Sequence, residues 1–60
     1  MQNFFYSLNE DVLTIYNYDG MSIADISEIT SETNINELVE NTLFNLDIIS
    51  GNDKIRVLPY

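Results

Sequence analysis

The sequence predicts a small α+β fold in which three helices are followed by a β-hairpin. Two patterns predict it. Three segments open with a small polar residue followed three residues later by an acid, as at a helix N-cap. The C-terminal segment has strand-forming stretches on either side of a glycine-containing turn. With 60 residues, of which 45% are apolar, the chain can form one compact core. We therefore expect residues 1–60 to be a single domain.

The first predicted helix covers about residues 8–17. Its apolar positions Leu8, Val12 and Ile15 fall on one face at helical spacing. It ends in Asn17-Tyr18-Asp19-Gly20, a group of turn-forming residues. The three predicted caps pair Ser7 with Glu10, Ser22 with Asp25, and Asn34 with Glu37.

The second predicted helix, residues 23–30, is shorter and repeats isoleucine every third residue. The third, residues 34–47, has the longest apolar face of the chain. That face contains Ile35, Leu38, Val39, Thr42, Leu43 and Leu46.

The predicted hairpin joins residues 48–50 to residues 54–58 through Gly51-Asn52-Asp53. The aromatic segment Phe4-Phe5-Tyr6 favours a strand and could add a third strand to the hairpin.

This order of elements resembles a small winged helix, with residues 34–47 as the recognition helix. Residues 12–49 more particularly resemble the winged-helix segments near the C-terminus of cullins, the scaffolds of ubiquitin ligases. The resemblance rests on Ile15-Tyr16-Asn17, on Ile26 with Thr30, and on Thr42-Leu43-Phe44-Asn45-Leu46. It implies a domain that makes contacts with proteins. The lysine that is modified in that family has no counterpart, since the only lysine, Lys54, lies outside the motif.

Charge and composition exclude several functions. The formal net charge is −8, and residues 33–50 contain no Lys, Arg or His, so we expect neither direct nucleic-acid binding nor attachment to an anionic membrane. The chain has no His and no Cys, which removes the usual nucleophile–base pairs and zinc ligands. We therefore expect no enzyme, no cofactor and no metal site. The absence of cysteine and of an apolar span favours the cytosol, or the host cytosol or nucleus for a viral protein.

The candidate partner-binding surface lies on the third predicted helix. At about 100° per residue, Phe44 falls opposite the centre of the apolar face. It is surrounded there by Glu37, Glu40, Asn41 and Asp47. Either Phe44 contacts a partner whose Lys and Arg side chains pair with these acids, or residues 4–6 or the hairpin fold over it.

The expected function is the binding of another protein that has a basic surface. Such binding would suit a small phage or viral protein that regulates or inhibits a host factor. It could act by DNA mimicry, in which carboxylates imitate phosphates. The alternative is a cullin-like winged-helix module of a ubiquitin-ligase scaffold. Both a monomer and a homodimer remain open.

Overall fold

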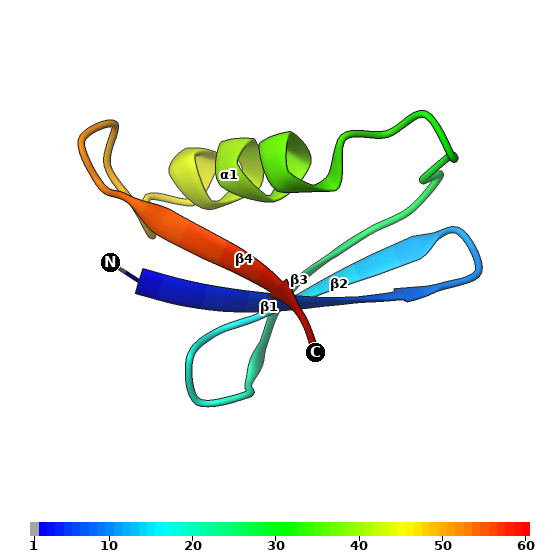
Figure 1. Ribbon diagram of the computed structural model, residues 1–60, viewed down its shortest axis with the longest axis horizontal. Helices are drawn as coiled ribbons and strands as arrows, with labels where there is room; N and C mark the ends of the chain where they lie inside the picture. The colour runs from blue at the N-terminus through cyan, green and yellow to red at the C-terminus, as the bar shows by residue number, and fades with distance from the viewer. Residues whose placement is uncertain (1) are drawn as a thin grey trace.

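The computed structural model describes residues 2–60, in which one α-helix packs on one face of a four-stranded mixed sheet (Figure 1). The elements are β1 (Gln2–Asn9), β2 (Val12–Tyr16), β3 (Ser22–Ile26), α1 (Ile35–Asn45) and β4 (Ile55–Pro59). The fold is α+β, but the predicted winged helix, with three helices and a C-terminal hairpin, is wrong.

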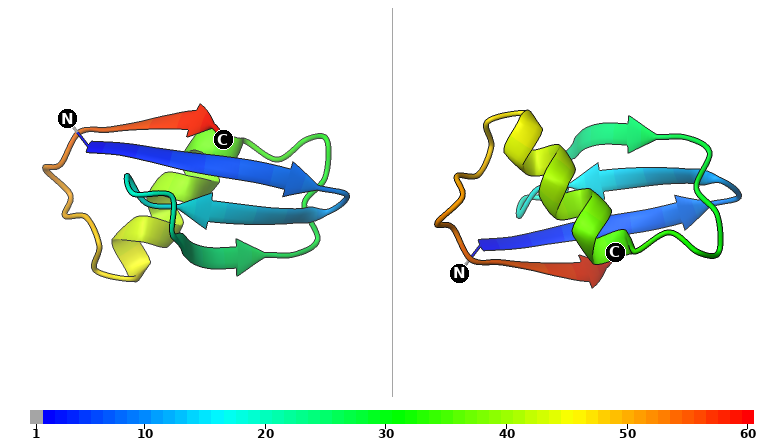
Figure 2. Two further views of the ribbon diagram at one scale, coloured as in Figure 1. Left: turned by 90° about the horizontal axis from the view of Figure 1, so that it is seen from below. Right: turned by 90° about the horizontal axis from the view of Figure 1, so that it is seen from above.

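The strand order in the sheet is β3-β2-β1-β4. The neighbours β1–β2 and β2–β3 are antiparallel, whereas β1 and β4 are parallel. A parallel pair needs a crossover connection, and α1 lies within the connection from β3 at one edge to β4 at the other. Figure 2 shows α1 crossing one face of the sheet diagonally, while no helix covers the other face.

The segment predicted as the first helix forms a β-hairpin instead. Glu10 and Asp11 are the two loop residues between β1 and β2, and Asn9 pairs with Val12 across the loop. The apolar spacing of this segment suits a helix, but Leu13 and Ile15 also alternate with period two. The β-branched and aromatic residues of β2 favour a strand. Ser7 is therefore not an N-cap, and its hydroxyl lies 2.9 Å from the Tyr16 hydroxyl.

The first half of the segment predicted as the second helix belongs to the edge strand β3 (Ser22–Ile26), and its second half is neither helix nor strand. Ala24 pairs with Ile15 and Ser22 with Tyr16, so that Ile23 forms a bulge between the two pairs. The loop before β3 is held by Asn17, whose Oδ1 accepts hydrogen bonds of 2.9 Å from the backbone N–H groups of Asp19 and Met21.

The third predicted helix is confirmed as α1. Asn34 is its N-cap, and the Oδ1 atom of Asn34 accepts a hydrogen bond of 3.1 Å from the Glu37 N–H. At the C-terminal end, the Asp47 N–H donates to the Phe44 carbonyl (3.1 Å) and the Ile48 N–H to the Leu43 carbonyl (3.0 Å). These two bonds form a Schellman motif, with Asp47 in the left-handed conformation at φ 60°.

The C-terminal hairpin is the other part of the prediction that is wrong. Residues 48–50 are not a strand. Residues 50–53 form a turn, in which the Ser50 N–H donates to Asp53 Oδ2 (2.7 Å). The predicted strand at residues 54–58 exists as β4, but it pairs with β1, with Phe4 opposite Val57. Residues 4–6 are likewise confirmed as a strand, within the longer β1.

The core lies between α1 and the sheet. Its buried side chains are Phe4, Leu13, Ile15, Val39, Leu43 and Ile49. Four of them have no exposed surface: Leu13, Ile15, Val39 and Leu43. Leu46, predicted to face the core, is instead 50% exposed because the helix ends at Asn45. Among residues 2–60, no helix is long and apolar enough to cross a membrane.

Candidate functional site

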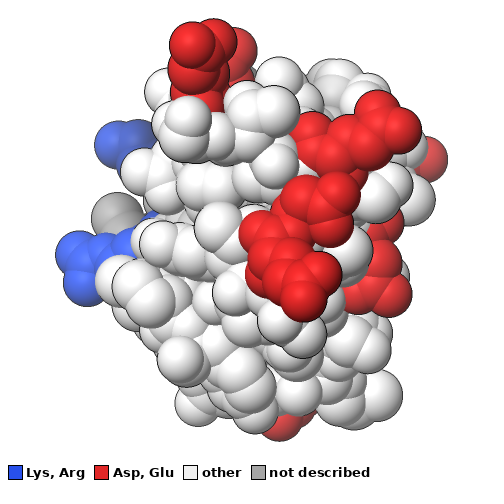
Figure 3. All heavy atoms as spheres, turned by 90° about the vertical axis from the view of Figure 1, so that its right-hand side faces the viewer, with Lys and Arg blue, Asp and Glu red and all other residues white. Residues whose placement is uncertain are grey.

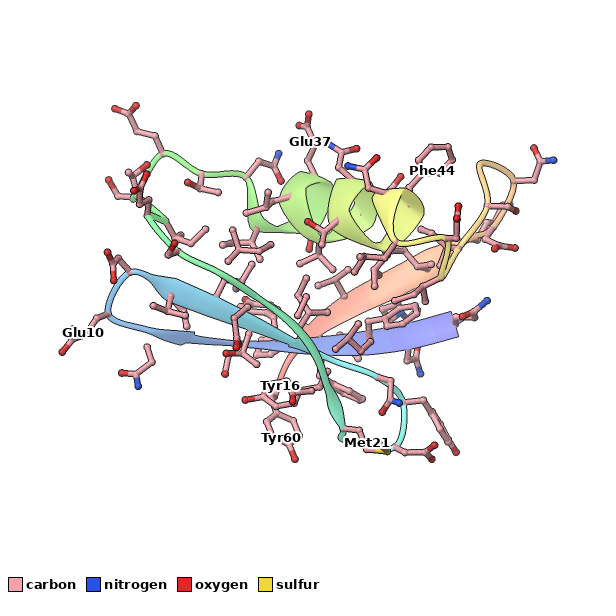
Figure 4. All side chains as sticks on the ribbon, turned by 180° about the vertical axis from the view of Figure 1, so that it is seen from behind. Glu10, Tyr16, Met21, Glu37, Phe44 and Tyr60 are labelled. Atoms are coloured by element: carbon pink, nitrogen blue, oxygen red, sulfur yellow. The ribbon has the colours of Figure 1, made fainter. Side chains whose placement is uncertain are left out.

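The five residues predicted to contact a partner lie together on the side of α1 that faces away from the sheet. Glu37, Glu40, Asn41 and Phe44 belong to α1, and Asp47 follows its C-cap. All five are exposed, and Figure 4 shows Glu37 and Phe44 projecting outward from the helix. We call these five residues the outer α1 surface.

Phe44 is the large apolar side chain of this surface, and 52% of it is exposed. One edge of its ring approaches the turn at residues 50–53, where a Cβ added at Gly51 would lie 3.8 Å from Phe44 Cε2. Figure 4 shows Phe44 on the side of the helix away from the sheet that contains β1, so β1 does not cover it. The ring is therefore supported on one side by the turn and open on the other.

The charges of the molecule are unevenly distributed. Figure 3 shows a band of Asp and Glu side chains across one side of the protein, with Lys and Arg atoms at the opposite edge of that view. Glu37 lies in the first turn of α1, where a carboxylate interacts favourably with the helix dipole, whereas Asp47 lies at the unfavourable end. The last turn of α1 contains no basic residue.

A second surface, the sheet face opposite α1, was missed by the sequence analysis. The strand pairing places on it Asn3, Phe5, Ser7, Asn9, Val12, Thr14, Tyr16, Ser22, Asp25, Arg56 and Leu58. We call this set the open sheet face. The signal that could have found it is the alternation in β1 and β2, which sends Phe5 and Tyr16 to the side opposite Phe4 and Ile15.

Three aromatic rings gather over the open sheet face. Tyr60 follows β4, and its ring stacks on that of Tyr16 with centroids 4.3 Å apart. The rings of Phe5 and Tyr60 are tilted, with centroids 6.1 Å apart. Tyr60 is 70% exposed, and Figure 4 shows Tyr16 and Tyr60 on the side of the sheet away from Phe44. The cluster is therefore accessible to solvent.

A cleft of about 560 Å³ opens where the start of β1 meets the loop after β2. It is lined by Gln2, Asn3, Phe4, Asn17, Tyr18, Asp19, Ile23 and Ile48. Among the described residues of this lining, Asp19 is the one with a charged side chain. Within residues 2–60, no three acidic residues lie close enough to hold a metal ion.

No family model, no curated protein and no solved structure matches the chain. The function must therefore be inferred from the two surfaces and their chemistry.

Proposed function

We propose that the protein binds another protein through the outer α1 surface. The observation that carries this proposal is Phe44, a large apolar side chain that is 52% exposed among carboxylates on a helix whose opposite side buries Val39 and Leu43. The partner contributes an apolar pocket for Phe44 and basic side chains for the acids around it.

The expected energetics suit an interface. Full burial of a Phe side chain is worth about 1.5–3 kcal/mol relative to full exposure. Because about half of Phe44 is already covered, a partner that covers the rest gains roughly half of that amount. Interfaces commonly combine such an apolar centre with a polar rim, and here Glu37, Glu40 and Asp47 supply the rim.

The charge of the chain determines the kind of partner. At a net charge of −8, the protein attracts a basic surface over a distance set by the Debye length, about 8 Å at physiological salt. A groove that normally holds a nucleic-acid backbone is one such surface, so the outer α1 surface would then act as a mimic of phosphates. Complex formation should weaken steeply with added salt in that case.

Capture of partners from a cell lysate tests the proposal, with Phe44→Ala as the variant. Leu8→Ala is the matched control, because Leu8 is 50% exposed at the far end of β1. Proteins held by wild type and by Leu8→Ala should be lost from Phe44→Ala, while the melting temperatures of the two variants should be similar, because both side chains are about half exposed. Retention of the same proteins by Phe44→Ala would contradict the proposal.

The rim is tested separately with Glu37→Gln combined with Glu40→Gln. Neutralising both carboxylates should slow association with a basic partner by about tenfold at low salt. The control combines Glu10→Gln with Asp19→Asn, which removes the same charge from the β1–β2 and β2–β3 loops. Equal slowing in the two double variants would show that only the net charge matters.

A further inference from the structure

We infer that the open sheet face is a dimer interface, and that a second copy of this chain packs on it face to face. This inference is independent of the partner proposed for α1, because Phe44 and Tyr60 lie on opposite sides of the sheet (Figure 4). It follows from the apolar character of the face, from its charge and from the positions of its two charged side chains.

The open sheet face has an apolar centre. Phe5, Tyr16 and Leu58 are partly buried by their neighbours in the sheet, yet they do not pack against the core beneath α1. Tyr60 lies over this centre through its contacts with Phe5 and Tyr16. A sheet usually buries an apolar face against another layer, and residues 2–60 supply such a layer on the α1 side only.

Charge favours a second copy as the occupant. The chain carries a net charge of −8, so most approaches between two copies are repulsive. The strand residues of the open sheet face contain one cation, Arg56, and one anion, Asp25, which makes the face neutral. Two copies can therefore approach through this face without bringing their acidic residues together.

The two charged side chains occupy opposite corners of the face. Arg56 lies on edge strand β4 opposite Asn3, two residues before Phe5. Asp25 lies on edge strand β3, opposite Thr14 of β2. Thr14 in turn pairs with Ser7 of β1, and Ser7 is two residues after Phe5. Neighbouring strands are about 4.8 Å apart, and the rise along a strand is about 3.3 Å per residue. Each charged residue is therefore roughly 10 Å from the centre of the Phe5–Tyr16 pair. That pair is at the midpoint between them.

This arrangement is complementary to itself. A two-fold axis that lies along the other diagonal of the face, through the point midway between Phe5 and Tyr16, carries Arg56 onto the position of Asp25. Each Arg56 then faces Asp25 of the second copy, which gives two ion pairs and the isologous contact that two-fold dimers use. The strands of the two sheets cross at about 90°, which is one of the two usual ways in which sheets pack.

Thr14 supports this role for Asp25. The Thr14 hydroxyl donates a hydrogen bond of 2.8 Å to Asp25 Oδ1, which holds the carboxylate over the sheet. The other carboxylate oxygen remains available to accept from a guanidinium group.

Sedimentation equilibrium of the full chain tests the inference through its mass. A monomer has 6.9 kDa and a dimer twice that mass. Dimers should form at or below about 1 mM protein in physiological salt. They should become more stable as salt screens the repulsion between two chains of charge −8. A chain that stays monomeric at that concentration, in both physiological and high salt, would overturn the inference.

Charge reversal identifies the surface. Arg56→Asp alone and Asp25→Arg alone should each weaken the dimer by about tenfold or more, because each places like charges together at both corners. The combined variant Arg56→Asp with Asp25→Arg should restore dimerisation. The control Glu32→Arg changes the net charge by as much as Asp25→Arg does, at an exposed site in the loop before α1, and should not weaken the dimer.

Tyr60→Ser tests the apolar contact without disturbing the core, because Tyr60 is 70% exposed and follows β4. The Kd of the dimer should rise by about tenfold at an unchanged melting temperature of the dilute monomer. If Tyr60→Ser and both single charge reversals leave the Kd unchanged, or if the double reversal fails to restore the dimer while remaining folded, the interface is not the open sheet face.

Discussion

Replacing Asp47 with Gly should stabilise the protein. Asp47 occupies the C′ position of the Schellman motif that ends α1, with φ 60°. Glycine is the residue most often found there, because it has no Cβ to clash in the left-handed conformation. Asp47 also places a negative charge at the C-terminal end of the helix, where the macrodipole disfavours it. The substitution relieves both effects.

The expected gain is about 1 kcal/mol in the free energy of unfolding. Relief of the left-handed conformation contributes about 1–2 kcal/mol, less for Asp than for most residues. Removal of the charge contributes about 0.3–1 kcal/mol. The greater freedom of glycine in the unfolded chain offsets about 0.5–1 kcal/mol. In a domain of this size, a gain of 1 kcal/mol raises the Tm by roughly 4–8 °C.

Thermal and urea unfolding monitored by circular dichroism measure the gain, and two further substitutions separate its causes. Asp47→Asn removes the charge and keeps a side chain that tolerates φ > 0, so it should gain a few tenths of a kcal/mol. Asp47→Ala removes the charge and keeps the strain, so it should gain less than Asn. If the Asp47→Gly variant is no more stable than the Asp47→Ala variant, then Asp47 is not in the left-handed conformation at the end of α1. That result would refute the Schellman geometry.

Three other predictions test the fold. Glu10→Gly should raise the free energy of unfolding by about 0.5–1 kcal/mol, as measured by urea unfolding. Glu10 has φ 59° at the first position of a two-residue hairpin loop, and type II′ turns favour Gly at that position. Asn17→Ala should lower the free energy of unfolding by about 1–2 kcal/mol, because Asn17 Oδ1 accepts hydrogen bonds from two backbone N–H groups. Asn17→Asp keeps an acceptor oxygen and should lower the free energy of unfolding less. Leu43→Ala should cost about 2–5 kcal/mol because Leu43 is fully buried, and Leu46→Ala should cost far less because Leu46 is half exposed.

The helix that could be predicted from the sequence is the one whose signals are local and agree with one another. Asn34 supplies an N-cap, Glu37 lies in the first turn, and the apolar positions from Ile35 to Leu43 keep helical spacing over the whole length. The outer α1 surface was predictable for the same reason, since helical geometry places Phe44 opposite Val39 once the helix is known.

The hairpin of β1 and β2 was not predictable from apolar spacing alone. Leu8, Val12 and Ile15 fit a helical face, while Leu13 and Ile15 fit one face of a strand, so the two periods compete over a short segment. The β-branched residues of β2 and the pairing with β3 decide in favour of the strand. The caps expected at Ser7 and Ser22 carried too little energy to reverse that preference.

The parallel pairing of β1 with β4 depends on residues at the two ends of the chain. Nothing near Ile55 indicates that its strand pairs with residues 2–6 and not with residues 48–50. The hairpin was predicted from the glycine-containing turn before β4, and that turn exists. Residues 48–50, which precede the turn, directly follow the Schellman motif at the end of α1 and do not form a strand. The open sheet face was missed in part for the same reason, since Arg56 and Leu58 join it only when β1 and β4 share a sheet.

The most direct test of the proposed function is amide chemical-shift mapping of the ¹⁵N-labelled protein with a partner that Phe44→Ala fails to capture. We predict that the perturbed amides belong to Glu37, Glu40, Asn41, Phe44 and Asp47. Amides of the open sheet face, such as those of Thr14 and Leu58, should remain unchanged at constant protein concentration. Perturbations centred on β2 and β4, with α1 unaffected, would contradict the account.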